Sequence, residues 1–366
     1  MRHLRVYASS VAVTAVALVV AGWHAGVDGV ALAAILGVLE ISLSFDNAVV
    51  NATVLEQMTE GWQQVFLTVG MVIAVFGMRL LFPLLVVWSA ADLGPADAMD
   101  LALHPPANGA SHFADGRPSY ETILTGAHPQ IAAFGGAFLL LLFLTFVFED
   151  QELTWLTPVE RRLRKFGQVP GLAVVVALAL VVALALFDVP SHETRSVLVA
   201  GVVGIVTFLA VQGLGSLFRT PAPPGKSSPD HTVGRGGMAL ASGRAAFFLF
   251  LYLEVLDASF SLDGVVGAFA ITSDPILILL GLGAIGAMFV RSITVHLVRE
   301  NVLSDYRYLS HGAHWAIGAL AVTLLVSITH HVPEVVTGLL GVGFIGASLV
   351  SSIQANRRDA LTPATD

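Results

Sequence analysis

The chain has 366 residues, of which 55% are hydrophobic and only 12% are charged, with a mean hydropathy of +0.80 and a net charge of -8. Soluble domains carry about 25% charged residues, so this composition excludes a soluble globular protein and predicts an all-α polytopic membrane protein. The sequence has no basic stripe that could follow phosphates, which argues against nucleic acid as a partner. It also has no cysteine, so any bound metal must use oxygen or imidazole ligands.

Ten apolar runs approach the ~20 residues that a helix needs to cross a bilayer. In chain order they cover about 5–23, 29–51, 64–89, 131–149, 170–188, 196–218, 245–272, 275–297, 312–330 and 334–354. The first run follows Arg2 and Arg5, as in a secretory signal. We expect it to remain as an uncleaved anchor, because the internal repeat described below requires this helix. The sequence therefore predicts about ten transmembrane helices.

Acidic and serine residues interrupt the second run, in the stretch V-L-E-I-S-L-S-F-D-N-A-V at 38–49. The seventh run repeats the pattern as V-L-D-A-S-F-S-L-D-G-V-V at 255–266. Both serines and the second acid recur at the same spacing, and Glu40 corresponds to Asp257. Ionisable residues at bilayer depth are costly and mark functional sites by default. We therefore expect these two acid–serine motifs, 38–49 and 255–266, to form the functional site.

The run after each motif carries an arginine, Arg79 in the third run and Arg291 in the eighth. Because the two motifs lie five runs apart, a duplicated unit of five helices must be inverted in the membrane. We expect a first repeat over 1–195 and a second over 196–366. Inverted repeats place substrate and ion sites at their interface near the bilayer midplane. The two motifs should therefore meet in the middle of the membrane.

Two long connections separate the apolar runs. Residues 90–130 are acidic and rich in Pro, Gly and His, so we expect an external cap or a poorly ordered loop. Residues 219–243 contain Pro-rich and Gly-rich stretches and indicate a flexible cytoplasmic linker between the two halves.

The lysines and arginines are distributed unevenly between the connections. With a cytoplasmic N-terminus, most of the 18 basic residues fall on the inner side, whereas only Arg117 and Arg195 fall outside. This asymmetry follows the positive-inside rule. Both termini are therefore expected in the cytoplasm.

The motifs predict a local break in each helix. On a regular helix, Asp46 and Asp263 would point about 120° away from Glu40 and Asp257, because one turn takes 3.6 residues. Serine side chains can bond to nearby carbonyls and bend a helix, and broken helices are tolerated where they line a polar cavity. We expect breaks around 42–47 and 259–264.

The side chains of the two motifs suit a hard metal cation. The candidate ligands are the carboxylates and neutral oxygens of Glu40, Asp46, Glu254, Asp257, Asp263, Asn47, Ser44 and Ser261. Oxygen ligands favour Mn²⁺, Mg²⁺ and Ca²⁺. Buried carboxylates cannot all stay ionised side by side without a cation, so we expect a divalent cation, or protons when the site is empty. Arg79 and Arg291 would balance the charge or seal a gate by pairing with an acid.

Structural interpretations remain open for the same residues. The acids could be polar contacts between helices, and Asn47 and the serines could only bond a carbonyl. Glu254 has Gly37 at the equivalent position of the first half, so it could serve helix solvation alone. The common motifs of soluble hydrolases, metalloproteases and nucleotide-binding enzymes are absent, so no enzymatic activity is expected.

The acid-x-Ser-x-Ser-x-Asp-Asn stretch at 40–47, its echo at 257–264 and the arginine in the following helix resemble the TerC family of integral membrane proteins. The stretches H-G-A-H-W-A-I-G-A-L-A at 311–321 and V-P-E-V-V-T-G-L-L-G at 332–341 resemble a long bacterial branch of that family. The likeness covers the second to fourth and the seventh to tenth runs. It implies a bacterial inner-membrane protein of the wider LysE-type transporter superfamily.

Similar proteins are linked to tellurium resistance and to manganese efflux. The resemblance places the acidic positions of the family on Glu40, Asp46, Asn47, Asp257 and Asp263. This sequence departs from the pattern at Gly264, where the first copy has Asn47. The resemblance therefore places fewer of the family's ligand positions in the second copy than in the first.

The leading hypothesis is an exporter of a divalent cation, with Mn²⁺ favoured, in which one half rocks against the other and protons exchange with the metal. The alternatives are an exporter of small organic cations or amino acids, and a membrane scaffold that docks metal-loading or tellurium-stress partners through 90–130 or 219–243. The expected partners are the lipid bilayer and the metal ion. A homo-oligomer is left open.

Overall fold

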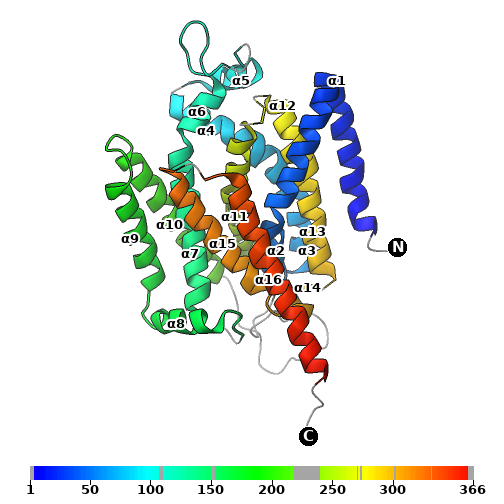
Figure 1. Cartoon of the computed structure of the whole chain (residues 1–366), viewed down its shortest axis with the longest axis vertical. Helices are drawn as coiled ribbons and strands as arrows, with labels where there is room; N and C mark the ends of the chain where they lie inside the picture. The colour runs from blue at the N-terminus through cyan, green and yellow to red at the C-terminus, as the bar shows by residue number, and fades with distance from the viewer. Residues whose placement is uncertain are drawn as a thin grey trace.

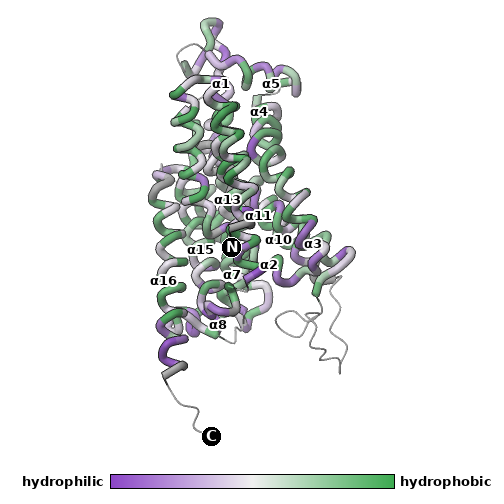
Figure 2. Tube along the Cα trace, turned by 90° about the vertical axis from the view of Figure 1, so that its right-hand side faces the viewer, coloured by the Kyte–Doolittle hydropathy of each residue, from purple (hydrophilic) through white to green (hydrophobic). Residues whose placement is uncertain are grey.

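The computed structural model describes residues 4–91, 93–106, 110–149, 153–217, 240–269, 271–272, 274–300, 302–330 and 332–361. This part of the chain consists of helices joined by short connections, with two isolated β-bridges and no strand. Hydrophobic residues follow the long helices, whereas hydrophilic ones gather at the upper loop and the lower helix ends (Figure 2). The prediction of an all-α polytopic membrane protein is confirmed.

The chain begins with a helical hairpin, α1 (Leu4–Leu43), that reverses at Ala25 and Gly26 (Figure 1). Gly26 has a φ of 65°, in the left-handed region that side chains other than glycine rarely adopt. The two arms pack closely, because a β-carbon on Gly29 would lie only 2.5 Å from the carbonyl oxygen of Ala21. The arms correspond to the first two predicted runs.

The chain then turns back through α2 (Phe45–Leu55) and rises as a composite helix. This helix contains two π-helical stretches, whose wider turns occur often at functional sites. Its segments are α3 (Glu60–Val65), η1 (Phe66–Gly70), η2 (Ile73–Leu81) and α4 (Phe82–Ala91). The predicted third run is thus one span of mixed helix type.

The outer connection is partly helical. It contains α5 (Pro95–Leu103) and α6 (Tyr120–Gly126), which lie over the upper end of the bundle (Figure 1). The buried Tyr120 ring lies 5.8 Å from the ring of Phe269, measured between centroids. Of the two expectations for 90–130, the described residues favour a cap.

The first half ends with α7 (His128–Phe148), α8 (Thr157–Gly167) and α9 (Leu172–Phe187). Helix α7 is the most enclosed of these and packs against α10 (Thr194–Leu217) and α15 (Leu309–Ser327). Helix α8 lies across the lower end of the bundle (Figure 1), at 99° to α9.

The second half repeats the pattern of a long motif helix followed by a composite span. Its remaining helices are α11 (Gly243–Phe269), α12 (Pro275–Ile278), η4 (Leu279–Ala287), α13 (Met288–Arg299), α14 (Val302–Asp305) and α16 (Glu334–Leu361). The second arm of α1 descends toward α2, whereas α11 rises toward α12 (Figure 1). The second arm of α1 packs on η4, and α11 packs on η2. Each motif helix therefore lies against the π-helical span of the other half, and the two run in opposite directions.

Seven helices of the described part are long and apolar enough to cross a membrane, or eight if the bent pair α8 and α9 counts as one span. This number is below the ten that we predicted. The first two runs share the hairpin α1, and α9, with 16 residues, is too short to count alone. The count covers only the described residues, and several side chains of α11 lie outside them. Each of the ten apolar runs nevertheless lies on a helix. Most of the predicted linker, 218–239, lies outside the described residues.

Candidate functional site

Glu40 is buried in the second arm of α1 and is bound on two sides. It is 2% exposed and forms an ion pair with the guanidinium group of Arg79, while the Ser44 hydroxyl donates to it at 2.8 Å. Arg79 also donates to the carbonyl oxygen of Ala74 at 2.9 Å. Arg79 lies in η2, and this bond to a carbonyl of the same stretch holds the guanidinium group beside Glu40.

Two glycines make room for Glu40. A β-carbon on Gly286 in η4 would overlap with the side-chain carbons of Glu40. A β-carbon on Gly264 in α11 would lie 3.2 Å from Oε2 of the same carboxylate. The second motif has Gly264 where the first has Asn47, and the structure gives a steric reason: the carboxylate of Glu40 lies against Gly264.

Asn47 and Asp257 join the two motifs directly. Both are buried, and the side-chain amide of Asn47 donates to Oδ1 of Asp257 at 2.7 Å. These residues are 210 positions apart in the chain. The structure therefore brings the two motifs together from opposite halves.

Glu254 lies one turn before Asp257 on α11, so the two carboxylates share a face of the helix. Glu254 is 6% exposed and Asp257 is 8% exposed. Three carboxylate oxygens have no hydrogen-bond partner among the described residues, namely both oxygens of Glu254 and Oδ2 of Asp257. Buried polar atoms are almost always paired, so three unpaired carboxylate oxygens in one place indicate a ligand site.

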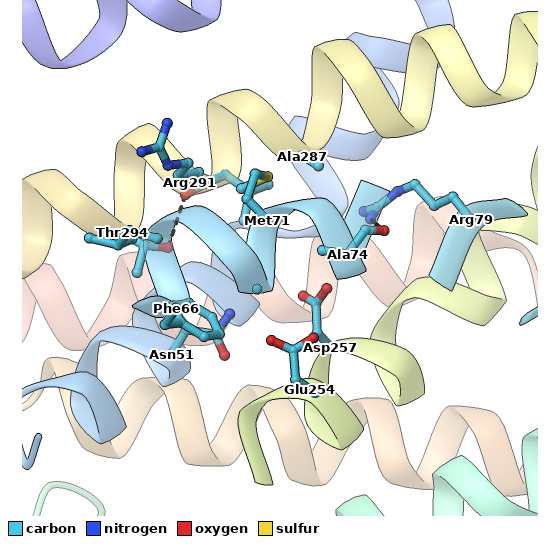
Figure 3. A pocket seen from close by; sticks show the side chains of 13 residues that line it. Asn51, Phe66, Met71, Ala74, Arg79, Glu254, Asp257, Ala287, Arg291 and Thr294 are labelled. Carbon is cyan, nitrogen blue, oxygen red and sulfur yellow. Dashed lines mark hydrogen bonds between the residues drawn. The ribbon is translucent and has the colours of Figure 1, made fainter. Parts of the chain in front are cut away.

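These carboxylates line a cavity of about 30 Å³ between α2, η1, α11 and α13. Figure 3 shows the carboxylate groups of Glu254 and Asp257 side by side, with Asn51 and Arg79 beside them. The cavity also contacts Arg291 and Thr294 of α13. A water molecule needs roughly 10–15 Å³ by this measure, so the space fits about two waters or one partly hydrated ion.

Gly70 and Asn51 complete this site, and the sequence reasoning missed both. A β-carbon on Gly70 would lie 2.7 Å from Oε1 of Glu254, so a larger residue here would displace that carboxylate from its present position. Asn51 is 3% exposed, and its Oδ1 is another unpaired buried oxygen of the described structure. The signal was present, because Asn51 follows Asn47 by four residues and therefore lies on the same face of α2.

Only one of the two predicted helix breaks occurs. Helix α1 ends at Leu43 and α2 begins at Phe45, with Ser44 between them at φ -97° and ψ 16°. In the second motif α11 continues through 259–264, so that prediction was wrong. Ser259 donates to the carbonyl oxygen of Val255 at 2.9 Å, and this contact leaves the helix intact. The side chains of Asp46, Ser261 and Asp263 lie outside the described part.

The predicted ligands do not all converge. Among the described side chains, no three of His, Cys, Asp and Glu lie close enough to hold a metal together. Glu40 and Ser44 are engaged with each other and with Arg79, whereas Glu254, Asp257 and Asn51 face the cavity. Mg²⁺-like ions usually take one or two carboxylates and keep several waters, so the smaller donor set still fits a hard divalent cation.

A family model described as a protein of unknown function (DUF475) matches residues 45–359. The match includes Arg79, both cavity carboxylates and Arg291, and it begins after Glu40 and Ser44. No curated protein and no solved structure matches the chain. The description of the family assigns no activity, so the function must be inferred from the site.

Proposed function

The chain belongs to the DUF475 family, and we propose that it is a membrane transporter that exports a divalent metal cation, with Mn²⁺ as the favoured substrate. One observation carries this proposal. Glu254 and Asp257 present three unpaired oxygens to a small buried cavity among helices that are apolar enough to span a membrane. An uncompensated buried charge costs several kcal/mol, so this pair requires a cation or protons.

The donor set and the size of the cavity support a metal ion. The amide oxygen of Asn51 adds a neutral donor to the two carboxylates. Sites built from oxygen alone favour Mn²⁺, Mg²⁺ and Ca²⁺ over softer metals. A space of about 30 Å³ has no room for a lysine-sized side chain, which argues against the export of organic cations or amino acids.

The packing of the helices supports alternating access. Each motif helix lies against the composite span of the other half, so the cavity is built from both halves. Rocking one half against the other would open such a site to one side at a time. When the cation leaves, Glu254 and Asp257 take up protons, so export of the metal is coupled to proton entry.

The resemblance to TerC proteins supports Mn²⁺ as the substrate and a bacterial inner membrane, and the distribution of lysines and arginines supports cytoplasmic termini. Tellurium resistance would then follow from metal handling. A homo-oligomer and a docking role for the outer cap or the linker are separate proposals.

Transport measured in vesicles tests the proposal. Purified protein is reconstituted into proteoliposomes that contain a fluorophore quenched by Mn²⁺. The wild type is expected to quench the fluorophore in the presence of a pH gradient, whereas Glu254→Gln and Asp257→Asn should each lose at least ten-fold in rate. The exposed acid Glu60 supplies the matched control, Glu60→Gln, which should transport as the wild type does. Wild-type rates in both cavity variants would refute the proposal.

A further inference from the structure

A second cavity lies next to the acidic one, beside α13. Its volume is about 180 Å³, and it opens between α13, the first arm of α1 and α3. Its polar lining includes Ser9, Gln64, Arg291 and Arg299. Arg291 also lines the acidic cavity, so one side chain borders both spaces.

Both charged side chains that line the second cavity are positive. Arg291 and Arg299 lie eight residues apart on α13, about two turns, and both line the cavity. Within the part of the chain that the structure describes, neither arginine forms a salt bridge, and Nε of Arg291 is buried without a hydrogen-bond partner. Two guanidinium groups at one cavity repel each other, so an anion placed between them would be stabilised.

We propose that this cavity binds one small oxyanion of the phosphate type, held by Arg291 and Arg299. The planar guanidinium group presents paired N–H donors that match the oxygens of phosphate and sulfate. The side chains of Ser9 and Gln64 add neutral donors at the same space. By the measure used for the acidic cavity, a water molecule needs roughly 10–15 Å³, so the second cavity has room for an oxyanion and several waters.

The oxyanion has two chemical sources, a lipid headgroup and a free ion. The cavity is bordered by the first arm of α1, which lies at the outside of the bundle (Figure 1). A lipid phosphate could therefore enter from the side, and a free ion could enter from the aqueous end near Arg299. Both sources present the same group to the arginines.

Occupancy of this cavity affects the acidic cavity through Arg291, a step that depends on the function proposed above. An oxyanion holds the guanidinium group of Arg291 away from Glu254 and Asp257, which leaves the carboxylates available to a metal cation. Metal binding in turn repels Arg291 toward the oxyanion. The two ligands should therefore strengthen each other's binding, and by linkage the effect must be reciprocal.

Binding of sulfate to the metal-free purified protein tests the site itself. Titration calorimetry with sodium sulfate, against sodium gluconate as the reference, is expected to show one site in the wild type. Arg299→Gln should bind sulfate at least ten-fold more weakly, and Arg291→Lys should also weaken it. Arg195 is an exposed arginine at the start of α10, so Arg195→Gln is the matched control and should bind as the wild type does.

A second experiment, which measures bound lipid, distinguishes the lipid headgroup from the free ion. Native mass spectrometry of protein taken from vesicles of phosphatidylcholine with phosphatidylglycerol counts the retained anionic lipid. Loss of one phosphatidylglycerol in Arg299→Gln, together with weak sulfate binding in the wild type, would support the headgroup. Tight sulfate binding without a change in retained lipid would support the free ion. If Arg299→Gln changes neither sulfate binding nor lipid retention, the site is refuted.

The coupling is measured by titrating Mn²⁺ with and without saturating sulfate. The wild type should bind Mn²⁺ more tightly with sulfate, and Arg299→Gln should lose this difference. Equal Mn²⁺ affinities in the wild type would refute the coupling and leave the oxyanion site intact. Failure of Mn²⁺ to bind at all would refute the proposed function, whereas the sulfate and lipid results would still decide the oxyanion site.

Discussion

Glu40 is enclosed by groups that leave it little freedom, and Gly286 is the tightest of them. A side chain at this position would collide with Cβ and Cγ of Glu40, which is held by Arg79 and Ser44. We predict that Gly286→Ala destabilises the protein by about 1–3 kcal/mol, the usual cost of overpacking. Gly343 on α16 has open space around it, so Gly343→Ala is the control. Thermal unfolding in detergent measures both, and equal melting temperatures would contradict the steric argument.

The stabilisation of the fold by Glu40 should depend on the presence of Arg79, and the reverse. Removal of one partner of a buried ion pair typically costs about 3–5 kcal/mol, because the other charge is left uncompensated. We predict that Glu40→Gln and Arg79→Gln each lower the free energy of unfolding strongly. The double variant should lower it by much less than the sum of the two single losses. A double-mutant cycle on thermal unfolding measures the difference. Additive losses would show that the two groups do not depend on each other.

Sequence reasoning identified the acids and two arginines that would pair with an acid, but not that Arg79 is the arginine that binds Glu40. The spacing of the two motifs singled out Glu40 and Asp257, and the structure brings their motifs together through Asn47. Arg79 lies in the π-helical stretch η2, which leaves no clear mark in the composition. Gly70 likewise resembles any other glycine of an apolar helix until Glu254 is placed beside it.

Helix α8 is held against α15 by one buried acid, Glu160. Glu160 accepts hydrogen bonds from the backbone of Trp155 at 3.0 Å and from the indole of Trp315 at 3.0 Å, and its Oε1 lies 3.3 Å from Nδ1 of His311. Burial alone raises the pKa of Glu160, but these hydrogen bonds outweigh it, so the net pKa lies below the ordinary value of a glutamate. The ionised form of Glu160 is therefore the one that the fold stabilises.

This gives a pH dependence with a defined sign. The stabilisation by Glu160 is fully present above the ordinary pKa of a glutamate and is lost as the pH falls toward its lowered pKa. We predict that the wild type melts at a higher temperature than Glu160→Gln at pH 7, and that the gap narrows below about pH 4. Thermal unfolding between pH 3 and 7 measures the gap, with Glu60→Gln as the exposed control. If the difference in melting temperature between the wild type and Glu160→Gln does not depend on pH, packing and not ionisation holds α8 in place.

The positions of the helices were predictable, whereas their turns and bends were only partly so. Hydropathy located all ten apolar runs, because helices are the regular way to satisfy the backbone in a bilayer. The predicted break at Ser44 occurs, although the Ser44 hydroxyl donates to the carboxylate of Glu40 and not to a backbone carbonyl. The same argument failed for α11, because Ser259 bonds back to Val255 without disturbing the ladder. Hydropathy also carries no information on the π-helical stretches η1, η2 and η4.

At the scale of the whole molecule, a bound cation should stabilise the fold. A ligand that binds only the folded state adds about 2.7 kcal/mol at a concentration one hundred times its Kd. We predict that Mn²⁺ raises the melting temperature of the wild type, that a chelator reverses the rise, and that Asp257→Asn abolishes it. An equal rise in Asp257→Asn would place the metal elsewhere.

The division into repeats at 1–195 and 196–366 stays a prediction, although the opposite directions of α1 and α11 agree with it.

The hairpin α1 is bound to the eighth span at both of its ends. Ser10 lies 2.6 Å from Ser292 near one end, and His24 lies 2.7 Å from Asp274, which also caps α12, at the other. Between these contacts, Gly281 and Gly286 bring η4 against the second arm. These contacts attach the hairpin, which lies in the first half, to a span of the second half. In the rocking motion proposed above, the first half would carry both Glu40 and Arg79 with their ion pair intact, whereas the contacts between the hairpin and the eighth span would have to break.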